Sequence, residues 1–459
     1  MDETPGTSTP QTTTPVPADP SARIRSRGWV IACCWFAIIV DGYDLIVYGT
    51  TVPALLSGSW ALTTGQAGQI GSAALVGMMI GALLAGVFTE RVGRRRLMLG
   101  CIAWFSVATA LSALAPSVEL FALTRLVAGV GLGGVMPTAI ALTLEYARPE
   151  RRSTANAVMF SGYSIGGVLA SLNAIWFLQT AGWRAMFWIG ALLGAVLLVV
   201  LWAALPESVT FLLGRGRRAE AEALAARYGM PLPEPVQDER ERAGVRALFE
   251  RGYAMSTVLF WLVTALGLLL VYGLNTWLAQ IMREAGYPLG SSLAFLLALN
   301  AGPILCTPLL GVLADRIGSR TVITGMFTTA AAAIALLMIR LPTPALLGLV
   351  TIAGACTIGT QTLLTAYIGG FYPKQLSATG LGWALGIGRV GGIVGPVYGG
   401  AILSTGWGLH ADFLSFALPA LLAAVLITLV RSRGPAASRA ADGHTRPHGR
   451  YAAPTTGGH

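Results

Sequence analysis

Charged side chains are scarce in this sequence, which excludes an ordinary water-soluble protein. Only 11% of the 459 residues are Asp, Glu, Lys or Arg, and 54% are hydrophobic. Typical soluble domains have about 25% charged residues, and a surface with so much less charge would not stay dispersed in water. The lipid bilayer is therefore the first partner that the sequence predicts.

Cysteine and histidine are also rare, and neither is arranged to bind a metal. The cysteines are odd in number, lie within apolar stretches and lack the spacing of disulfide or zinc sites; they are Cys33, Cys34, Cys101, Cys306 and Cys356. We interpret them as small apolar packing residues. The histidines lie at the edge of one apolar stretch, at His410, or beyond residue 431. We expect no metal, no cofactor and no histidine proton carrier.

Nucleotide motifs and catalytic constellations are missing as well. The run GVGLGG from Gly129 resembles a dinucleotide loop, but it lies inside a hydrophobic segment with no strand before it. Close helix packing explains these glycines better. No Walker sequence is present, which argues against ATP-driven transport. A membrane enzyme or receptor would need a catalytic cluster or an added domain, so we predict that the protein is not an enzyme.

Long apolar segments, in contrast, are abundant. Crossing the hydrocarbon core takes about 20 apolar residues in a helix. Twelve such windows begin near Gly28, Gln66, Leu97, Glu119, Ser153, Trp183, Tyr253, Gly290, Thr321, Thr343, Ser377 and Leu409. The sequence predicts an all-α integral membrane protein with twelve transmembrane helices.

Composition shifts divide the chain into five parts. The first segment has no cleavage pattern and follows a Thr/Pro-rich leader, so it is not a signal peptide. The central hydrophilic loop contains RGRRAEAEALAARYG, which predicts an amphipathic surface helix. The expected parts are a disordered cytoplasmic leader (1–27), a six-helix bundle (28–205), a cytoplasmic central loop (206–252), a second six-helix bundle (253–431) and a disordered cytoplasmic tail (432–459).

The basic residues predict the orientation in the membrane. Cytoplasmic loops retain Lys and Arg, and most of the 31 basic residues fall on one side if both termini are inside. We therefore expect a multi-pass protein of the cytoplasmic (inner) membrane with both termini in the cytoplasm. Membrane orientation also explains the net charge of +10, so no nucleic acid partner is expected.

Two loops of the sequence are copies of one another. The run GVFTERVGRRR from Gly86 recurs as GVLADRIGSR from Gly311. Val47-Tyr48-Gly49 likewise recurs as Val271-Tyr272-Gly273. Repetition at offsets of 225 and 224 residues predicts two related halves of six helices each.

Two carboxylates, Asp41 and Asp44, lie within the first apolar segment. A charge near the bilayer centre costs roughly 2.5 to 3.5 kcal/mol on insertion scales, and intramembrane acids mark ion or proton paths. The two acids are i,i+3 neighbours, and Tyr48 continues their helical face. Two acids so close in a poorly solvated site cannot both ionise easily, so the pair is suited to proton coupling. The alternative is that one acid caps a helix break at Gly42 or pairs with a neighbouring helix.

Two intramembrane arginines are the corresponding cations. Arg125, in the fourth segment, could neutralise the acids and couple their protonation to helix movement, or form a purely structural ion pair. Arg389, in the eleventh, has Ser164 as its repeat counterpart, so the cation occurs in one half only. A guanidinium can hold a carboxylate bidentately and stack on a ring. We predict Arg389 as a substrate ligand, with helix packing or gating as the alternative.

Aromatic and amide side chains in the segments complete the expected substrate site. Both halves could present ring faces to a pocket between them. Lipid-facing or packing roles are the alternative for each of these residues. The candidates are Tyr48, Tyr272, Trp277, Trp383, Asn300 and Gln361.

The repeated loop and the two halves of six segments resemble the major facilitator superfamily over about residues 28–431. In that superfamily the acid and arginines of the loop clamp helix ends at the cytoplasmic face. Glu90 stands where aspartate is usual, which implies a longer and looser clamp. The resemblance implies cytoplasmic gating by Gly86, Glu90, Arg91, Gly93, Arg94, Glu145, Asp315, Arg316, Gly318 and Arg320.

Three further stretches resemble the aromatic acid:proton symporters. They are DGYD from Asp41, RLVAGVGLGGVMPTAIALTLEYARPERRS from Arg125 and YPKQLSATGLGWALGIGRVGGIVGP from Tyr372. Ser377 departs from the usual arginine. A further run, LPESVTFLLGRGR from Leu205, is similar to the PES segment of sugar and organic acid porters.

The resemblance implies a proton symporter that imports benzoate, a hydroxybenzoate, protocatechuate or a similar acid by alternating access. We expect a monomer. A symporter for a nonaromatic acid such as shikimate or a dicarboxylate is the main alternative. Antiporters that export drugs usually carry a G-P-x-x-G-G element in the fifth segment. Here GPVYGG lies in the eleventh segment, so a drug exporter is disfavoured.

Overall fold

The computed structural model describes residues 26–232, 245–250, 252–339 and 341–430. The side chains of residues 308 and 374 are not described. The predicted tail, and the predicted leader except for its last two residues, lie outside the described residues. Their predicted disorder and cytoplasmic location therefore stay predictions.

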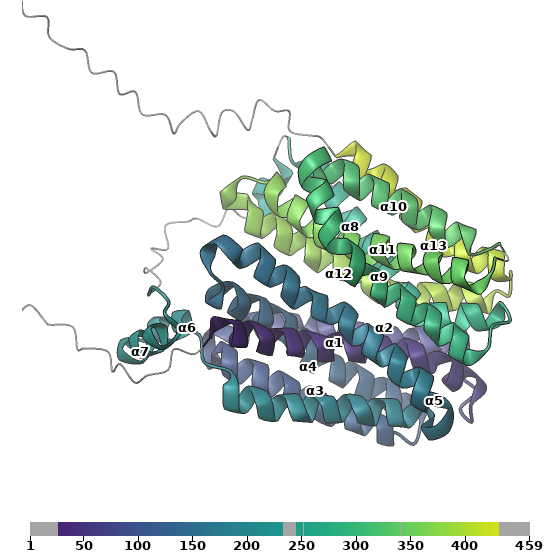
Figure 1. Cartoon of the computed structure of the whole chain (residues 1–459), viewed down its shortest axis with the longest axis horizontal. Helices are drawn as coiled ribbons and strands as arrows, with labels where there is room; N and C mark the ends of the chain where they lie inside the picture. The colour runs from purple at the N-terminus through teal and green to yellow at the C-terminus, as the bar shows by residue number, and fades with distance from the viewer. Residues whose placement is uncertain (1–25, 233–244, 251, 340, 431–459) are drawn as a thin grey trace, which may run out of the picture. The chain divides into compact units, whose positions relative to one another are not determined.

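The described chain is helical throughout its regular elements (Figure 1). Their order is α1 (Arg27–Ser57), α2 (Thr64–Val92), α3 (Arg94–Leu114), α4 (Val118–Tyr146), η1 (Pro149–Arg151), α5 (Arg152–Ala204), α6 (Val209–Gly214), α7 (Arg218–Tyr228), η2 (Val245–Phe249), α8 (Ala254–Glu284), α9 (Leu289–Ile317), α10 (Ser319–Leu336), α11 (Thr343–Phe371), α12 (Lys374–Ser404) and α13 (Leu409–Leu429).

Ten stretches of the described chain are long and apolar enough to cross a membrane. One of them runs from Pro149 to Ala204 and contains a break at Gly182 (φ 76°, ψ 173°), so α5 is two helices that meet at a kink. α12 has 31 residues but does not reach the same hydropathy, because it is rich in glycine. Counting both parts of α5 and α12, the twelve predicted segments are all helical in the described chain.

The predicted starts agree with the structure to within three residues. Local chemistry explains several of these boundaries. Ser117 caps α4 by accepting a hydrogen bond from the Leu120 amide, and Ser208 caps α6 through the Phe211 amide. Gly229 ends α7 in the left-handed conformation, where glycine carries no Cβ penalty. The predicted surface helix of the central loop is confirmed as α7.

The two copies of the repeated loop have matching backbones. Gly93 precedes α3 with φ 95° and ψ 156°, and Gly318 precedes α10 with φ 93° and ψ 135°. Both conformations are readily open only to glycine. The repeat read from the sequence is therefore also a repeat of local structure.

Chain contacts divide the protein into two compact units. Unit 1 comprises Met1–Leu45, Val76–Leu169 and Ala181–Asp238, and unit 2 comprises Ile46–Leu75, Ala170–Thr180 and Glu239–His459. α1, α2 and α5 each contribute to both units. The units do not coincide with the expected bundles 28–205 and 253–431, whose division stays a prediction.

Each unit has its own helix packing. In unit 1, α3 packs against α4, and α6 packs against α7. In unit 2, α8 contacts α12 and α13, α9 contacts α11, and α10 contacts α11 and α13.

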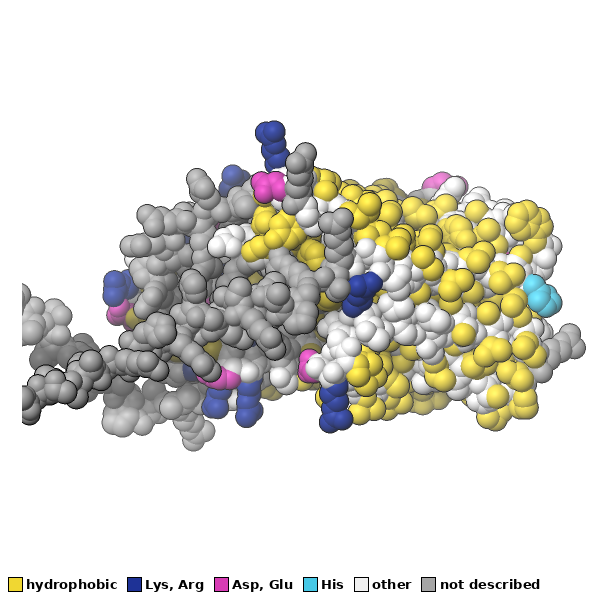
Figure 2. Space-filling model, turned by 90° about the horizontal axis from the view of Figure 1, so that it is seen from above, with side chains coloured by type: hydrophobic (Ala, Val, Ile, Leu, Met, Phe, Trp, Pro, Cys, Tyr) yellow, Lys and Arg dark blue, Asp and Glu magenta, His cyan; other side chains and the backbone are white. Residues whose placement is uncertain are grey.

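Apolar side chains remain exposed on the outside of the long helices. Where grey atoms leave the face in Figure 2 visible, hydrophobic side chains dominate, and charged side chains gather mainly toward one end. Leu83, Leu309 and Leu418 are each at least 60% exposed. Such a surface is typical of contact with lipid.

Candidate functional site

A buried ion pair between α1 and α4 is the central polar feature of unit 1. Asp41 and Asp44 are 0% and 1% exposed, and Arg125 is 1% exposed. Arg125 Nη1 lies 2.7 Å from Asp44 Oδ1, and Arg125 Nη2 donates to the Asp44 carbonyl at 3.3 Å. The guanidinium carbon also lies 5.4 Å from the ring centre of Phe187. In this structure Asp44 therefore pairs with a neighbouring helix, which was the alternative role considered for one of the acids.

Close packing of α1 against α5 holds the acids in place. A Cβ atom on Gly42 would overlap the Tyr163 backbone, and one on Gly166 would overlap the Ile39 carbonyl. The Tyr43 hydroxyl donates to the Met186 carbonyl at 3.1 Å. This part of α1 is thus fixed on both sides of the acids.

The Asp44 carboxylate makes its ion-pair contact through one oxygen only. Asp44 Oδ2 has no hydrogen-bond partner among the described residues, so one carboxylate oxygen is engaged and one is not. Breaking a buried pair by removing one partner is strongly unfavourable, because it leaves a buried charge. Neutralising Asp44 alone would leave the Arg125 cation buried without this carboxylate, so the two groups are coupled.

The second polar feature lies in unit 2 and consists of two amides. Asn300 Nδ2 donates to Asn275 Oδ1 at 2.9 Å and to the Leu296 carbonyl at 3.0 Å, while Asn275 Nδ2 donates to the Val271 carbonyl at 2.7 Å. Asn300 is 0% exposed. Asn300 is therefore committed to a protein contact, and Asn275 is a polar residue that the sequence analysis missed.

Two other predicted substrate residues are also committed to the protein. The Tyr48 hydroxyl donates to the Ala67 carbonyl at 2.5 Å, and Trp277 Nε1 donates to the Pro396 carbonyl at 2.8 Å. Tyr48 is 2% exposed and Trp277 is 0% exposed. In this conformation both act as packing and anchoring residues.

The remaining predicted substrate residues are more accessible. Arg389 is half-buried on α12 and makes no hydrogen bond or ion pair within the described residues. Trp383, 44% exposed on the same helix, stacks on Trp261 with ring centres 6.0 Å apart. Tyr272 is half-buried against Gly392. Gln361, half-buried on α11, donates to the Thr264 carbonyl at 3.4 Å.

The segment 46–75 packs tightly on α8 and α12 within unit 2. A Cβ atom on Gly49 would overlap the Asn275 carbonyl, and one on Gly68 would overlap the Pro396 carbonyl. The Ser72 hydroxyl donates to the Ile393 carbonyl at 2.5 Å. Residues 46–75, from α1 and α2, are therefore in close contact with α8 and α12 within unit 2.

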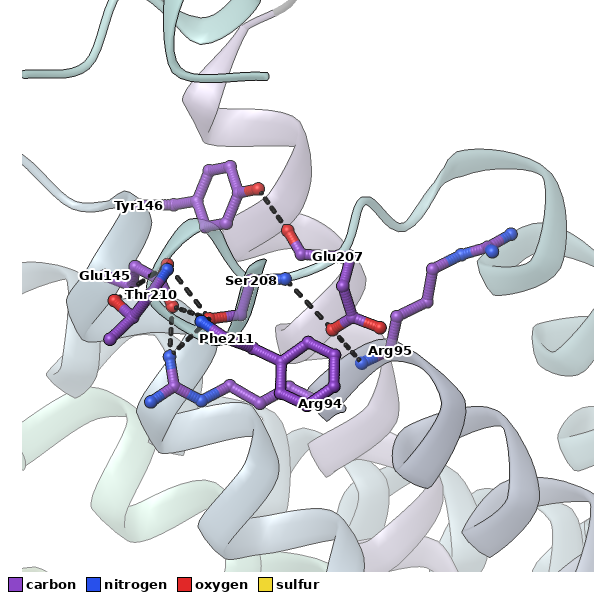
Figure 3. Close-up of polar contacts among 8 residues, drawn as sticks. All are labelled: Arg94, Arg95, Glu145, Tyr146, Glu207, Ser208, Thr210 and Phe211. Atoms are coloured by element: carbon purple, nitrogen blue, oxygen red, sulfur yellow. Dashed lines mark hydrogen bonds and ion pairs between the residues drawn. The ribbon is translucent and has the colours of Figure 1, made fainter. Parts of the chain in front are cut away.

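A charged network joins the start of α3 and the end of α4 to α6 (Figure 3). Arg94 forms an ion pair with Glu145 and donates to the Ser208 hydroxyl at 2.9 Å. Glu145 also accepts from the Thr210 amide at 2.9 Å. One carboxylate therefore ties three segments together.

A second carboxylate, Glu207, extends this network. Its Oε1 accepts from the Arg95 amide at 2.9 Å, and its carbonyl accepts from the Tyr146 hydroxyl at 2.7 Å. Carboxylates at helix N-termini are favoured by the exposed amides and the helix dipole. Glu207 thus caps α3 from outside that helix. Figure 3 shows the Arg95 guanidinium pointing away from the Glu145 cluster.

The predicted gating residues fall into two groups. Arg94 and Glu145 are paired, Gly93 lies against the Glu207 carboxylate, and Arg320 donates to the Thr428 carbonyl. The side chains of Glu90, Arg91, Asp315 and Arg316 are exposed and make no ion pair within the described residues, and Gly86 has open space beside it. Their gating role stays a prediction.

Sequence reasoning missed Glu207, Ser208 and Thr210 as members of this network. The run LPESVTFLLGRGR contains all three. The pattern was visible, but its partners on α3 and α4 were not, because spacing in a sequence does not reveal contacts between distant segments.

Comparison with known families identifies a match over most of the chain. The model of the Major Facilitator Superfamily matches residues 34–305 and 295–452. Solved structures agree in fold: the xylose transporter XylE from E. coli, in a partially occluded inward open conformation, has a TM-score of 0.69 at 16% identity, covering 88% of this chain and 98% of that chain. A bacterial homologue of the human lysosomal transporter Spinster has a TM-score of 0.68 at 16% identity, covering 90% and 96%. The predicted all-α membrane fold is confirmed.

Closer relatives by sequence are transporters. The benzoate transport protein of Acinetobacter baylyi is 38% identical over 88% of this chain and 89% of its own length. The gentisate transporter of Corynebacterium glutamicum is 36% identical over 86% of each chain. The gallate transporter of Pseudomonas putida is 34% identical over 92% of this chain and 96% of its own length.

Proposed function

The chain belongs to the major facilitator superfamily, among its aromatic acid transporters, and we propose that it imports an aromatic carboxylic acid together with a proton. The named substrates of the relatives, benzoate, gentisate and gallate, share a benzene ring that bears one carboxylate. At this level of identity the ring substituents differ between relatives. The proposal therefore names the shared ring and carboxylate and leaves the hydroxyl pattern to experiment.

The buried pair of Asp44 and Arg125 carries the proposal of proton coupling. A carboxylate that is 1% exposed in a membrane-spanning helix is costly to keep charged without a partner. In the proposed cycle a proton reaches Asp44, with Asp41 three residues away, and the contact with Arg125 is released. Loss of the proton restores the ion pair. The proton therefore switches one contact between α1 and α4.

Arg389 is the proposed ligand for the substrate carboxylate. Its half-buried guanidinium has no partner within the described residues, and a guanidinium binds a carboxylate through two parallel hydrogen bonds. Trp383 and Tyr272 present aromatic surface in the same unit. Rings of this kind add roughly 0.5 to 1.5 kcal/mol per aromatic pair beyond the area they bury.

Alternating access follows from the superfamily architecture. In such carriers the two halves rock around a site near the bilayer midplane. We propose that the bundles 28–205 and 253–431 are these halves. Residues 206–252 and both termini would lie on the cytoplasmic side, and the protein would act as a monomer. The Arg94–Glu145 network and the repeated loops would then act at the cytoplasmic face.

Uptake into proteoliposomes tests this function. The purified full-length protein is reconstituted, an inward proton gradient is imposed, and labelled benzoate, 4-hydroxybenzoate, gentisate and gallate are compared. We expect accumulation of at least one acid, its loss with an uncoupler, and no accumulation by Asp44→Asn. Excess unlabelled shikimate or succinate should not compete.

The matched control is Glu150→Gln, which removes an exposed carboxylate of η1 outside every proposed site and should retain proton-driven accumulation. Accumulation that survives both the uncoupler and Asp44→Asn would refute proton coupling. Competition by shikimate at the same concentration as benzoate would refute the aromatic substrate class.

A further inference from the structure

A strongly basic pocket lies at one end of unit 1, where α2, α3 and α5 meet α6 and α7. It encloses about 720 Å³. Two of its lining residues are acidic, Glu207 and Glu220, and six are arginines, which leaves a formal excess of four positive charges. The arginines are Arg91, Arg95, Arg96, Arg215, Arg217 and Arg227.

Within the described residues neither acid forms an ion pair with the other five arginines of the pocket. Glu207 accepts from the amides of Arg95 and Ser208 at 2.9 and 3.0 Å. Glu220 is bonded through both oxygens to Arg217 at 2.7 and 2.6 Å, and this hydrogen bonding lowers the pKa of the Glu220 carboxyl.

Several guanidinium groups are left available. Within the described residues the side chains of Arg91, Arg96 and Arg227 donate no hydrogen bond and form no ion pair. Arg95 Nε is buried and has no hydrogen-bond partner within the described residues. Unpaired cations held next to one another repel, so the pocket favours an anion.

The wall of the pocket is preformed. Val209 and Leu212 of α6 are buried against Ala221 and Ala225 of α7. Arg27, at the start of α1, donates to the carbonyls of Tyr228 and Gly229 and so holds the end of α7. The pocket therefore does not need to be assembled by its ligand.

An apolar strip leads directly to the pocket. On α5, Leu192, Val196, Val199 and Trp202 are 64%, 56%, 66% and 68% exposed. Their spacing of three and four residues places them on one helical face. The Trp202 carbonyl accepts a hydrogen bond from Arg95 Nη2 at 2.6 Å, and Ala203 lines the pocket.

The geometry points to a binding site for an anionic phospholipid, whose phosphate is held by Arg95, Arg96 and Arg227 while an acyl chain lies along the apolar strip. Arginine binds phosphate through charge-assisted, often paired hydrogen bonds. Basic pockets beside membrane helices on the cytoplasmic side bind anionic headgroups. A soluble anion would use the arginines and leave the strip unused, so the strip selects the lipid. None of the residues proposed to bind the proton or the substrate lines this pocket, whereas Arg91 of the repeated loop does.

Lipid titration of the purified full-length protein in detergent tests the site. Native mass spectrometry measures bound phosphatidylglycerol, phosphatidylcholine and, as a soluble probe, glycerol 3-phosphate. We expect phosphatidylglycerol to bind more tightly than the other two. In Arg96→Gln/Arg227→Gln its binding should weaken about 25-fold, because each arginine near an anionic headgroup contributes about a fivefold factor.

The matched control is Arg151→Gln/Arg152→Gln, which removes the same charge from exposed positions of unit 1 outside the pocket. It should bind phosphatidylglycerol within about twofold of the wild type. Circular dichroism and elution volume verify that both variants are folded. Three results would overturn the assignment: equal binding of the two lipids, equal effects of the two variants, or glycerol 3-phosphate binding as tightly as phosphatidylglycerol.

Discussion

Single residues carry the proposed chemistry. For the pair of Asp44 and Arg125, a role in stability and a role in transport can be measured separately. Each side chain is 1% exposed and their charged atoms lie 2.7 Å apart. Such a pair does not by itself prove a net stabilising effect, because burial of both charges offsets their attraction. Comparing single and double substitutions distinguishes the two roles.

We predict that Arg125→Gln lowers the free energy of unfolding by about 3–5 kcal/mol, since it leaves the Asp44 carboxylate buried without its partner. The double variant Asp44→Asn/Arg125→Gln should regain most of this stability but accumulate no substrate. Thermal unfolding in detergent and proteoliposome uptake are the two measurements. A double variant as unstable as Arg125→Gln would contradict the assignment of the loss to an unpaired charge.

Substitution of Arg389 should change substrate affinity. Arg389→Gln removes the proposed carboxylate ligand, and hydrogen bonds to charged groups contribute about 1.5–3 kcal/mol. We expect KM for uptake to rise at least about tenfold. Arg389→Lys should recover only part of the affinity, because an ammonium lacks the paired geometry.

The control for this series is Arg283→Gln, an exposed position in the last turn of α8. Its KM should stay at the wild-type value. An unchanged KM in Arg389→Gln would exclude Arg389 as the ligand.

At this scale the sequence identified polar residues inside the helices more readily than it identified the groups that they contact. Asp44, Arg125 and Asn300 stood out because polar groups are rare in apolar segments. Their partners lie far along the chain, and helical periodicity defines a face but not the neighbour that meets it. For the same reason Trp277 was interpreted as a ring for substrate, whereas in the structure it anchors α8 to the Pro396 carbonyl.

Helices and their connections were more predictable than contacts. A segment of about 20 apolar residues has few alternatives to a helix in lipid, because its backbone groups must be satisfied internally. The sequence therefore predicts the helices with starts that lie within three residues of those observed. The distribution of α1, α2 and α5 over both compact units depends on packing between distant segments and was not predicted.

The tight contact of α1 with α8 gives a test at the level of elements. Gly49→Ala places a methyl group against the Asn275 carbonyl, so the two helices must move apart locally. We expect a loss of about 1–3 kcal/mol in the free energy of unfolding, measured by thermal denaturation.

Gly325→Ala on α10 is the matched control, because that glycine is exposed and has open space beside it. Its stability should stay the same or rise by up to about 1 kcal/mol, since alanine favours helix. If both variants behave alike, the contact at Gly49 does not limit stability.

For the whole molecule, the arginine distribution predicts which side faces the cytoplasm. A reporter active only in the cytoplasm should be active when fused after residue 430. A reporter active only outside should be active when inserted at Gly58, between α1 and α2. The reverse pattern would contradict the predicted orientation, and with it the cytoplasmic location of the basic pocket. Inactive reporters at both positions would point to misfolded fusions and call for insertion at a second loop.

The hydrogen bond that the Arg95 amide, in the first turn of α3, donates to Glu207 has a consequence for dividing the gene. Two co-expressed fragments are a common way to ask whether a duplicated protein needs a continuous chain. A cut after Leu205 would separate the first fragment from the Glu207 carboxylate that caps α3 and from Ser208 and Thr210, which bind Glu145, whereas a cut after Gly229 would keep all three residues in the first fragment. The chain is therefore best divided more than twenty residues beyond the end of its sixth long helical segment. Two co-expressed fragments should restore transport when the cut is the later one and fail to do so when it is the earlier one.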